Sequence, residues 1–267
     1  MTSPPERPPS GEVFTIHRLR KVFGEEKPYV ALDGVDLTIR DGEFLCLLGA
    51  SGCGKSTLLN LLAGFDRPNG GTLLYRGRPV ERPGRERVMF FQDAGAALLP
   101  WLTVQHNVEF GLRLQGALHS ERRARAEECL ALVGLLEHRA KVPSEISGGM
   151  RQRLQIARAL AVDPDVFLMD EPFGALDAIT RRRMHLALLD VWQKTRRTIV
   201  FVTHDIMEAL TLADRIAVMS VGPRSRIAHL IEIGLGRPRN PADPELGRLF
   251  ARLETLLDGS HATEAAA

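Results

Sequence analysis

The feature that most constrains the fold is a glycine-rich loop placed between an apolar strand and a helix. Residues 45–48 form a nearly continuous apolar run, which is typical of a strand buried on both faces. The stretch "GASGCGKST" follows at residues 49–57 and fits the pattern G-x-x-x-x-G-K-[ST] in full. It continues into "STLLNLLAG", a helix that we expect to end at Gly64. This order predicts an α/β fold with a phosphate site where the helix begins.

The residue types of this loop suit a nucleotide. Glycines let backbone N–H groups close around phosphate oxygens, and the helix N-terminus adds partial positive charge. Lys55 would reach the β- and γ-phosphates, and the Ser56 hydroxyl would bind Mg²⁺. The predicted phosphate-binding residues are Gly49, Ala50, Ser51, Gly52, Cys53, Gly54, Lys55, Ser56 and Thr57.

The rest of the chain divides by its periodicity. Residues 12–23 and 31–49 are predicted to form strands with a turn at Asp41-Gly42, and residues 70–80 are predicted to form a hairpin. From about residue 93 to residue 162 the apolar spacing is helical, which indicates an inserted helical block in which Ser120 is expected to cap a helix. Buried strands return in "DVFLMDEP" and "RTIVFVTHD". We expect a disordered tail at residues 1–11, and a short helix with a flexible tail at residues 236–267.

Composition excludes several classes of protein. The net charge of +2 is too balanced to indicate a nucleic-acid partner. Cys46, Cys53 and Cys129 have no paired spacing, which indicates reduced thiols of a cytosolic protein. The start "MTSPPERPPSG" lacks the apolar region of a secretion signal. Apolar runs such as "FLCLLGA" are far shorter than the ~20 residues of a membrane-spanning helix, so work at a membrane would be done from its surface.

Two adjacent acids end one of the buried strands. Successive strand residues point to opposite faces, so Asp170 and Glu171 serve one site only if the strand ends there. Asp170 suits Mg²⁺ held through its waters, and Glu171 would polarise an attacking water as a general base. The alternative is a helix cap before Pro172. The phosphate loop earlier in the chain favours the catalytic interpretation.

Two further polar residues follow apolar strands. Gln92 comes after "RVMFF", and its amide could meet both Mg²⁺ and the water. His204 comes after "VFVT", at the carboxyl edge of the sheet, where ligands of open α/β folds collect. Asp205 can serve merely as the N-cap of the following helix.

A second helix start is also rich in glycine. In "EISGGMRQRLQIARAL", residues 145–160, Ser147 is a natural N-cap, and Gly148 and Gly149 occupy the first helical positions. Missing side chains there would let an anion approach bare N–H groups. Met150 cannot close the capping box that a glutamine would form, so Ser147 alone is predicted to hold this helix start.

In this order, the motifs closely resemble those of the ATP-binding subunit of an ABC transporter, over about residues 12–235. They are "GASGCGKST" as Walker A, Gln92 as Q-loop, "ISGGM" as signature, "VFLMDEP" as Walker B, "GALD" as D-loop and "VTHD" with the switch histidine. The stretches "LLPWLTVQHNV", "SGGMRQR" and "GALDAITR" are most similar to the branch that serves nitrate, sulfonate and taurine importers.

The resemblance implies a P-loop NTPase core of RecA type, with a small antiparallel β-subdomain and an inserted α-helical subdomain. Two cassettes, expected to be copies of one chain, would meet head to tail. Each ATP, with Mg²⁺, would lie between the Walker A of one copy and the signature of the other. Ser147, Gly148 and Gly149 would then contact the γ-phosphate bound to the partner, and Asp177 in the D-loop would bridge the two sites.

The resemblance also implies roles for single residues. Ser56, Gln92 and Asp170 would hold Mg²⁺, while Gln92, Glu171 and His204 would act in hydrolysis. An aromatic residue after the first strand stacks on adenine in this family. Phe23 matches that position, and Tyr29, on the other side of the loop at residues 25–28, is the alternative.

The implied function is ATP hydrolysis that powers import of a small anion of the nitrate, sulfonate or taurine type. The chain would work with a separate membrane permease and, indirectly, a solute-binding protein, at the cytoplasmic face of the inner membrane. Another cargo stays open, because the permease and the binding protein read the cargo. A non-transport ABC ATPase acting on DNA or the ribosome is disfavoured, because the chain holds one compact cassette and no basic stripe; no nucleic-acid partner is expected.

Two features depart from the family pattern, and one residue of the phosphate loop has two interpretations. Ile146 stands where leucine is usual, and the run Asp93–Leu99, where a coupling helix of the permease would dock, is longer than expected. Cys53 inside the phosphate loop is interpreted as a small tolerated residue. The alternative is a redox-sensitive thiol whose pKa the helix N-terminus lowers.

Overall fold

The strand that leads into the glycine loop is buried along its whole length. In the computed structural model, which describes residues 11–90, 98–174, 176–240 and 242–262, all five residues of β3 (Phe44–Leu48) are buried. The chain forms two compact units: residues 1–83 with 203–267, and residues 84–202. Of the predicted tail at residues 1–11, only residue 11 is among the described residues. Gln92 also lies outside the described residues.

The first unit contains two groups of strands. β1 (Glu12–Phe23), β2 (Tyr29–Arg40), β4 (Gly70–Tyr75) and β5 (Arg78–Pro79) form an antiparallel sheet in the order β2-β1-β4-β5. β3 pairs in parallel with β9 (Arg215–Met219), which pairs antiparallel with β10 (Ile227–Glu232). The strands and the hairpin predicted for this part are confirmed.

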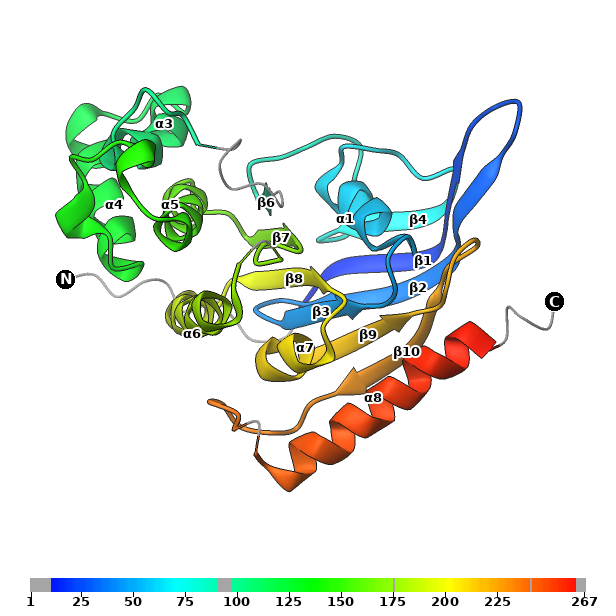
Figure 1. Cartoon of the computed structure of the whole chain (residues 1–267). Coiled ribbons are helices and arrows are strands. Elements are labelled where there is room, and N and C mark those ends of the chain that lie inside the picture. The colour runs from blue at the N-terminus through cyan, green and yellow to red at the C-terminus, as the bar shows by residue number, and fades with distance from the viewer. Residues whose placement is uncertain (1–10, 91–97, 175, 241, 263–267) are drawn as a thin grey trace. The chain divides into compact units, whose positions relative to one another are not determined.

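Among the described residues of the first unit there are three helices: α1 (Lys55–Ala63), α7 (Ile206–Leu212) and α8 (Pro244–Ala262) (Figure 1). α1 ends where the sequence predicts, because Gly64 is its C-cap with φ 80°. A side chain at Gly64 would also meet the Arg82 carbonyl oxygen at 2.4 Å, so this position requires glycine for two reasons. α7 packs against β3 on one side and against α8 on another.

The second unit combines a parallel sheet with a group of helices. β6 (Arg87–Phe90), β7 (Val166–Asp170) and β8 (Thr198–Thr203) pair in parallel with β7 in the middle. α3 (Val104–Leu114), α4 (His119–Leu132) and α5 (Gly148–Ala161) pack against one another, as the green helices of Figure 1 show. Short 3₁₀ turns lie at Leu136–His138 and Pro143–Glu145, and α6 (Ala178–Thr195) follows β7.

The helix cap predicted at Ser120 is wrong. α4 begins at His119 and its N-cap is Leu118, so Ser120 lies inside the first turn. The reason is that the Glu121 carboxylate reaches back and accepts the Leu118 N–H at 3.1 Å, which satisfies the helix start two residues earlier.

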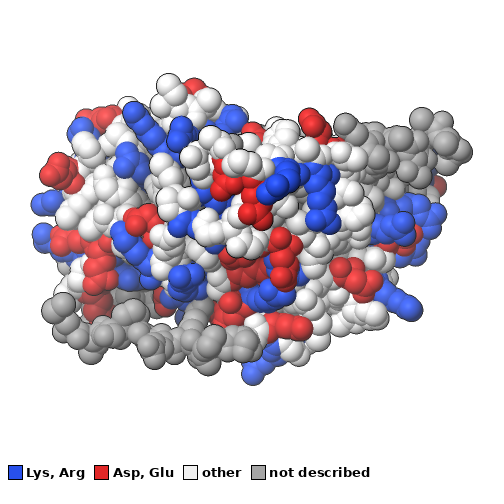
Figure 2. Space-filling view, turned by 90° about the horizontal axis from the view of Figure 1, so that it is seen from below, with Lys and Arg blue, Asp and Glu red and all other residues white. Residues whose placement is uncertain are grey.

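The surface carries charges of both signs. Figure 2 shows basic and acidic side chains of the described residues intermixed on one face. No helix within the described ranges has the length and apolarity that crossing a membrane requires.

Candidate functional site

The glycine loop of the first unit forms a cradle of backbone groups. Gly52 and Gly54 adopt φ of 79° and 87°, the left-handed region that favours glycine. A side chain on Gly49 would lie 2.7 Å from the Cys53 sulfur. Gly54 is the N-cap of α1 and has no side chain with which to cap it. The first N–H groups of α1 are thus presented by the loop itself, and this arrangement fits a phosphate.

Lys55 lies over this cradle. Its Nζ donates to the carbonyl oxygens of Gly49 at 2.9 Å and Ala50 at 2.7 Å, and the residue is 4% exposed. Ser56, next along the first turn of α1, is exposed. The loop therefore places an ammonium and a hydroxyl beside the same N–H groups, as a site for phosphate with Mg²⁺ requires.

The thiol of Cys53 is buried within the phosphate loop. The residue is 1% exposed, and burial raises the pKa of its thiol although the Lys55 ammonium nearby acts in the opposite direction. The lowered pKa considered from the sequence is therefore wrong, because burial outweighs the positive charges around the sulfur. The interpretation as a small tolerated residue is favoured.

The two candidate adenine-stacking residues are neighbours. Phe23 and Tyr29 face each other across the β1–β2 pair, and they are 42% and 48% exposed. The Lys21 ammonium lies 4.8 Å from the centroid of the Phe23 ring. Because both rings are accessible at one hairpin end, Phe23 and Tyr29 both stay candidates.

His204 is exposed between β8 and α7. Asp205 caps α7, as the sequence predicts, by accepting the Glu208 N–H at 3.0 Å. The Thr203 hydroxyl accepts the Asp205 N–H at 3.0 Å and donates to the Glu208 carboxylate. These bonds fix the backbone on both sides of His204.

In the second unit, β7 ends between the two predicted carboxylates. Asp170 is its last residue, and Glu171 adopts φ 43°, a left-handed conformation that is costly for a residue with a side chain. The Glu171 N–H donates to the Val202 carbonyl oxygen at 3.2 Å. The strand therefore ends where both acids could serve one site, and strain of about 1–3 kcal/mol at such a position is typical of functional residues.

The glycine-rich start of α5 has the predicted cap. The Ser147 hydroxyl accepts the Met150 N–H at 3.3 Å. The prediction that Ser147 alone holds this start needs one addition. The Arg151 guanidinium also donates to the carbonyl oxygens of Pro143 at 3.4 Å and Ile146 at 3.1 Å, which fixes the turn before the helix.

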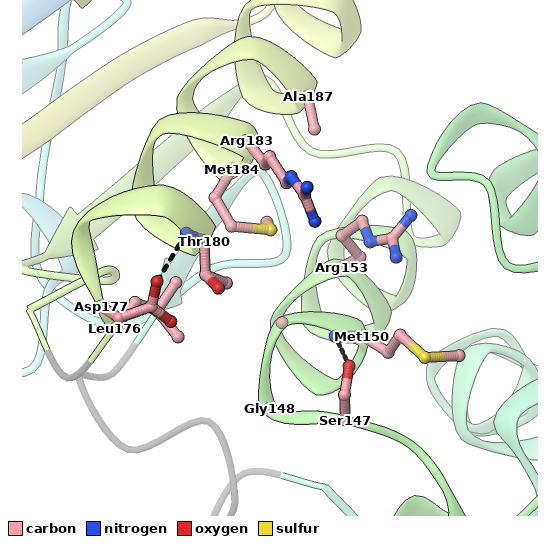
Figure 3. A pocket seen from close by; sticks show the side chains of 11 residues that line it. Ser147, Gly148, Met150, Arg153, Leu176, Asp177, Thr180, Arg183, Met184 and Ala187 are labelled. Carbon is pink, nitrogen blue, oxygen red and sulfur yellow. Dashed lines mark hydrogen bonds between the residues drawn. The ribbon is translucent and has the colours of Figure 1, made fainter.

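A pocket of about 490 Å³ joins this helix start to the start of α6 (Figure 3). The pocket thus brings together the signature and D-loop residues that the sequence singled out. Arg153 and Arg183 project into it from the two helices, as Figure 3 shows. Its lining comprises Ser147, Gly148, Gly149, Met150, Arg153, Leu176, Asp177, Thr180, Arg183, Met184 and Ala187.

Asp177 is the N-cap of α6. Its carboxylate accepts the N–H groups of Ile179 at 3.1 Å and Thr180 at 3.0 Å, and the Thr180 bond drawn in Figure 3 contributes most to holding the pKa of Asp177 below its usual range. A side chain on Gly149 would meet the Thr180 methyl group at 3.1 Å. The starts of α5 and α6 are therefore fitted closely to each other.

Two supporting residues were not predicted. Gln152, on α5, donates to the Pro172 carbonyl oxygen at 2.8 Å, directly after Glu171. Arg181, on α6, donates to the carbonyl oxygens of Phe173 at 3.3 Å and Leu176 at 2.8 Å. Gln152 and Arg181 therefore hold the segment between Glu171 and Asp177. The Gln152 bond spans 20 residues, so no local pattern in the sequence signals it, whereas the Arg181 bonds span 8 and 5 residues.

The predicted site residues thus fall into two groups. The phosphate loop, Phe23 and His204 belong to the first unit; the carboxylates, Ser147–Gly149 and Asp177 belong to the second. Within the described residues, no three His, Cys, Asp or Glu side chains gather as a metal site. A hydroxyl and a carboxylate still suit Mg²⁺, which binds through few protein ligands together with phosphates.

Comparison with known proteins agrees with these motifs. The profile of the ABC transporter family matches residues 32–174. The chain is 45% identical to the bicarbonate transport ATP-binding protein CmpD of Synechocystis over 90% of this chain and 85% of that protein. It is 46% identical to the nitrate import ATP-binding protein NrtD of Synechococcus elongatus over 85% of this chain and 83% of that protein.

A solved structure shows the same fold. It is the dimeric ATP-binding cassette MJ0796 in a post-hydrolysis state bound to ADP and Pi. The similarity has a TM-score of 0.70 at 32% identity and covers 84% of this chain and 100% of that one.

Proposed function

Because this chain belongs to the ABC transporter family, we propose that it is the ATP-hydrolysing subunit of an importer for a small anion. Its similarity to ATP-binding proteins named for bicarbonate and for nitrate supports this class of cargo. Both are small singly charged oxyanions. The nitrate branch indicated by the sequence agrees with this class, and a sulfonate such as taurine remains a further candidate.

One observation carries the proposal of a composite ATP site. Gly148 has an ordinary helical backbone, because it is absent from the residues with positive φ. A side chain there would have only the Arg151 guanidinium nearby, at 3.9 Å. Neither backbone conformation nor packing within the described chain therefore calls for glycine. Glycine at this position would instead leave room for a phosphate that another copy of the chain holds on its own glycine loop. The dimeric ADP-bound relative supports this arrangement.

The roles of the remaining residues follow from their chemistry. Lys55 and the N–H groups of α1 would hold the β- and γ-phosphates. Glu171 would take a proton from the attacking water, and His204 would contact the γ-phosphate. Bound Mg²⁺ would neutralise charge that develops on the phosphates. Ser56 and Asp170 would hold it with Gln92, which lies outside the described residues.

The partners follow from the family. A second copy of the cassette would complete each ATP site, and a membrane permease would receive the motion through the region that begins near Asp93. A solute-binding protein would deliver the cargo to the permease, and the cassette would sit at the cytoplasmic face of the membrane. Another cargo is the alternative function. Co-purification of the chain with its permease, followed by identification of the associated solute-binding protein, distinguishes the two.

Substitution of the general base tests the hydrolysis mechanism. Glu171→Gln keeps the size of the side chain and removes its basicity, so the variant should bind ATP, stop turning over and accumulate a closed dimer. The matched control is Glu137→Gln, an exposed glutamate in the same unit, which should keep wild-type activity. Turnover of Glu171→Gln at the wild-type rate would show that the base is assigned wrongly.

A further inference from the structure

Two arginines hold the C-terminal end of the helix that follows His204. Arg239 donates through Nη1 to the carbonyl oxygens of Leu210 at 2.6 Å and Ala213 at 2.7 Å. Arg237 donates through Nη2 to the carbonyl oxygen of Leu212 at 2.6 Å. Three carbonyls at the end of α7 thus receive charged donors from a segment about 25 residues further along the chain.

This helix needs such support. α7 has seven residues, and helices shorter than about 12 residues are marginal in water. Its last carbonyls have no partners within the helix, and the partial negative charge at that end attracts cations. Two guanidinium groups satisfy both requirements. Burial lowers the pKa of Arg239 to about 10, so this side chain stays protonated at neutral pH.

The arginines are themselves anchored. Arg239 also donates through Nη2 to the Leu235 carbonyl oxygen at 3.0 Å. Arg237 pairs with Asp214 at 2.6 Å, and the Asp214 carboxylate accepts the Phe44 N–H at 2.9 Å. Phe44 is the first residue of β3, the strand that runs into the phosphate loop. The segment therefore ties the end of α7 to the base of the strand that carries the nucleotide loop.

The other end of α7 carries His204. Asp205 caps the helix, and the bond between Thr203 and Glu208 joins the residue before His204 to the helix's first turn. These bonds couple the backbone around His204 to α7. α8 packs on α7 as well, with Leu246 and Leu253 buried, so the chain after β10 covers this short helix.

We propose that Arg237 and Arg239 are positioning residues for His204, acting through α7 rather than on the nucleotide. The inference rests on the proposed role of His204 in hydrolysis. It assigns a catalytic purpose to the C-terminal segment, which the sequence alone indicated only as a helix and a tail. Loss of the clamp, defined as the bonds from Arg237 and Arg239 to α7, should displace His204 and leave the phosphate loop intact.

The test is a double-mutant cycle on the assembled transporter. Arg239→Ala should lower kcat by about tenfold to a hundredfold, the range expected when a catalytic group is displaced by about 1 Å. The dissociation constant for ATP should change by less than about twofold, because the phosphate loop is untouched. In the His204→Ala background, measured by single-turnover hydrolysis, Arg239→Ala should have almost no further effect. Arg252→Ala, an exposed arginine on α8, is the matched control and should behave as wild type in both backgrounds.

Two results would overturn the proposal in distinguishable ways. An equal loss of turnover in both backgrounds would show that Arg239 acts independently of His204, and the role of His204 would stand. Wild-type turnover in His204→Ala alone would refute the role of His204 and the positioning proposal with it. If Arg239→Ala does not fold, Arg239→Lys enters the same cycle. Its hydrogen exchange at residues 206–212 should be faster than in wild type while residues 55–63 stay unchanged; unchanged exchange at 206–212 would also refute the clamp.

Discussion

Replacement of Gly148 by alanine separates the stability of the fold from its function. Gly148 and Gly149 both begin α5 with ordinary helical backbone, but their surroundings differ. A side chain on Gly148 finds only the Arg151 guanidinium, at 3.9 Å, which is ordinary contact. A side chain on Gly149 meets the Thr180 methyl group at 3.1 Å, so a neighbour must move. Gly148→Ala is thus the cleaner perturbation.

The expected gain in stability follows from helix propensity. Glycine in a helix interior is less favourable than alanine by about 0.5–1 kcal/mol, which is the upper bound for Gly148 at the first helical position, and nothing near Gly148 opposes a methyl group. For a chain of this size, that free energy raises the Tm by about 2 °C. The substitution should therefore stabilise the protein measured without nucleotide.

The expected loss of activity follows from the phosphate contact. A methyl group on Gly148 would stand where the partner's γ-phosphate approaches the N–H groups of α5. A hydrogen bond to a charged group contributes about 1.5–3 kcal/mol. Loss of one such bond in the transition state lowers kcat/KM by roughly tenfold to a hundredfold. Stability and activity should therefore move in opposite directions.

Thermal unfolding and ATP hydrolysis of the same preparations measure both effects. Gly247→Ala is the control, because Gly247 lies in α8, has helical backbone and would have no atom within 4 Å of a new side chain. The Tm of Gly247→Ala should rise by a similar amount, and its ATP hydrolysis should stay at the wild-type rate. Wild-type hydrolysis by Gly148→Ala, with the expected rise in Tm, would refute the phosphate site at α5.

Three other perturbations give further checks. Because burial raises the pKa of Cys53, iodoacetamide should alkylate Cys53 more slowly at neutral pH than it alkylates the thiol of free glutathione. The rate of alkylation of Cys53 should rise only as the pH is raised, and equal rates for the two thiols, measured by mass spectrometry, would contradict this. Amides 147–151 should exchange hydrogen more slowly when ATP is bound, and equal protection in both states would count against ATP contact at α5. The pKa of Asp177 is lowered, so its helix cap stabilises the fold above the usual aspartate pKa, and this stabilisation is lost as the pH falls through the lowered pKa. The Tm difference between wild type and Asp177→Ala should therefore shrink in strong acid. A Tm difference that stays constant with pH would exclude this linkage.

Local patterns in the sequence predicted local structure well. The strand, glycine loop and helix at residues 44–64 depend on neighbours in the chain, and so do the caps at Ser147 and Asp205. The failure at Ser120 is local too: two residues competed for one helix start, and the carboxylate of Glu121 satisfies an earlier N–H.

Properties set by tertiary packing were beyond the sequence. The pKa of Cys53 depends on how deeply its sulfur is buried, which no pattern of neighbours reveals. Gln152 holds the segment after Glu171 through the Pro172 carbonyl oxygen, 20 residues further along the chain. Arg239 reaches a helix 26 residues earlier in the chain. A polar side chain that binds a distant backbone oxygen has no spacing rule, so such residues are found only from the fold.

The two glycine-rich helix starts differ in a way that fits different tasks. α1 begins with Gly54 in the left-handed conformation and no side-chain cap, and the Lys55 ammonium donates to the Gly49 carbonyl oxygen of the same loop, so the first N–H groups of α1 would face a phosphate bound there. α5 begins with a side-chain cap, and Ser147 already occupies the Met150 N–H. The second start therefore offers fewer free donors, and it lines the pocket that it shares with the start of α6. In the proposed dimer it would contact the end of a phosphate chain without enclosing it, which would suit the two starts to opposite sides of one nucleotide rather than to two separate ones.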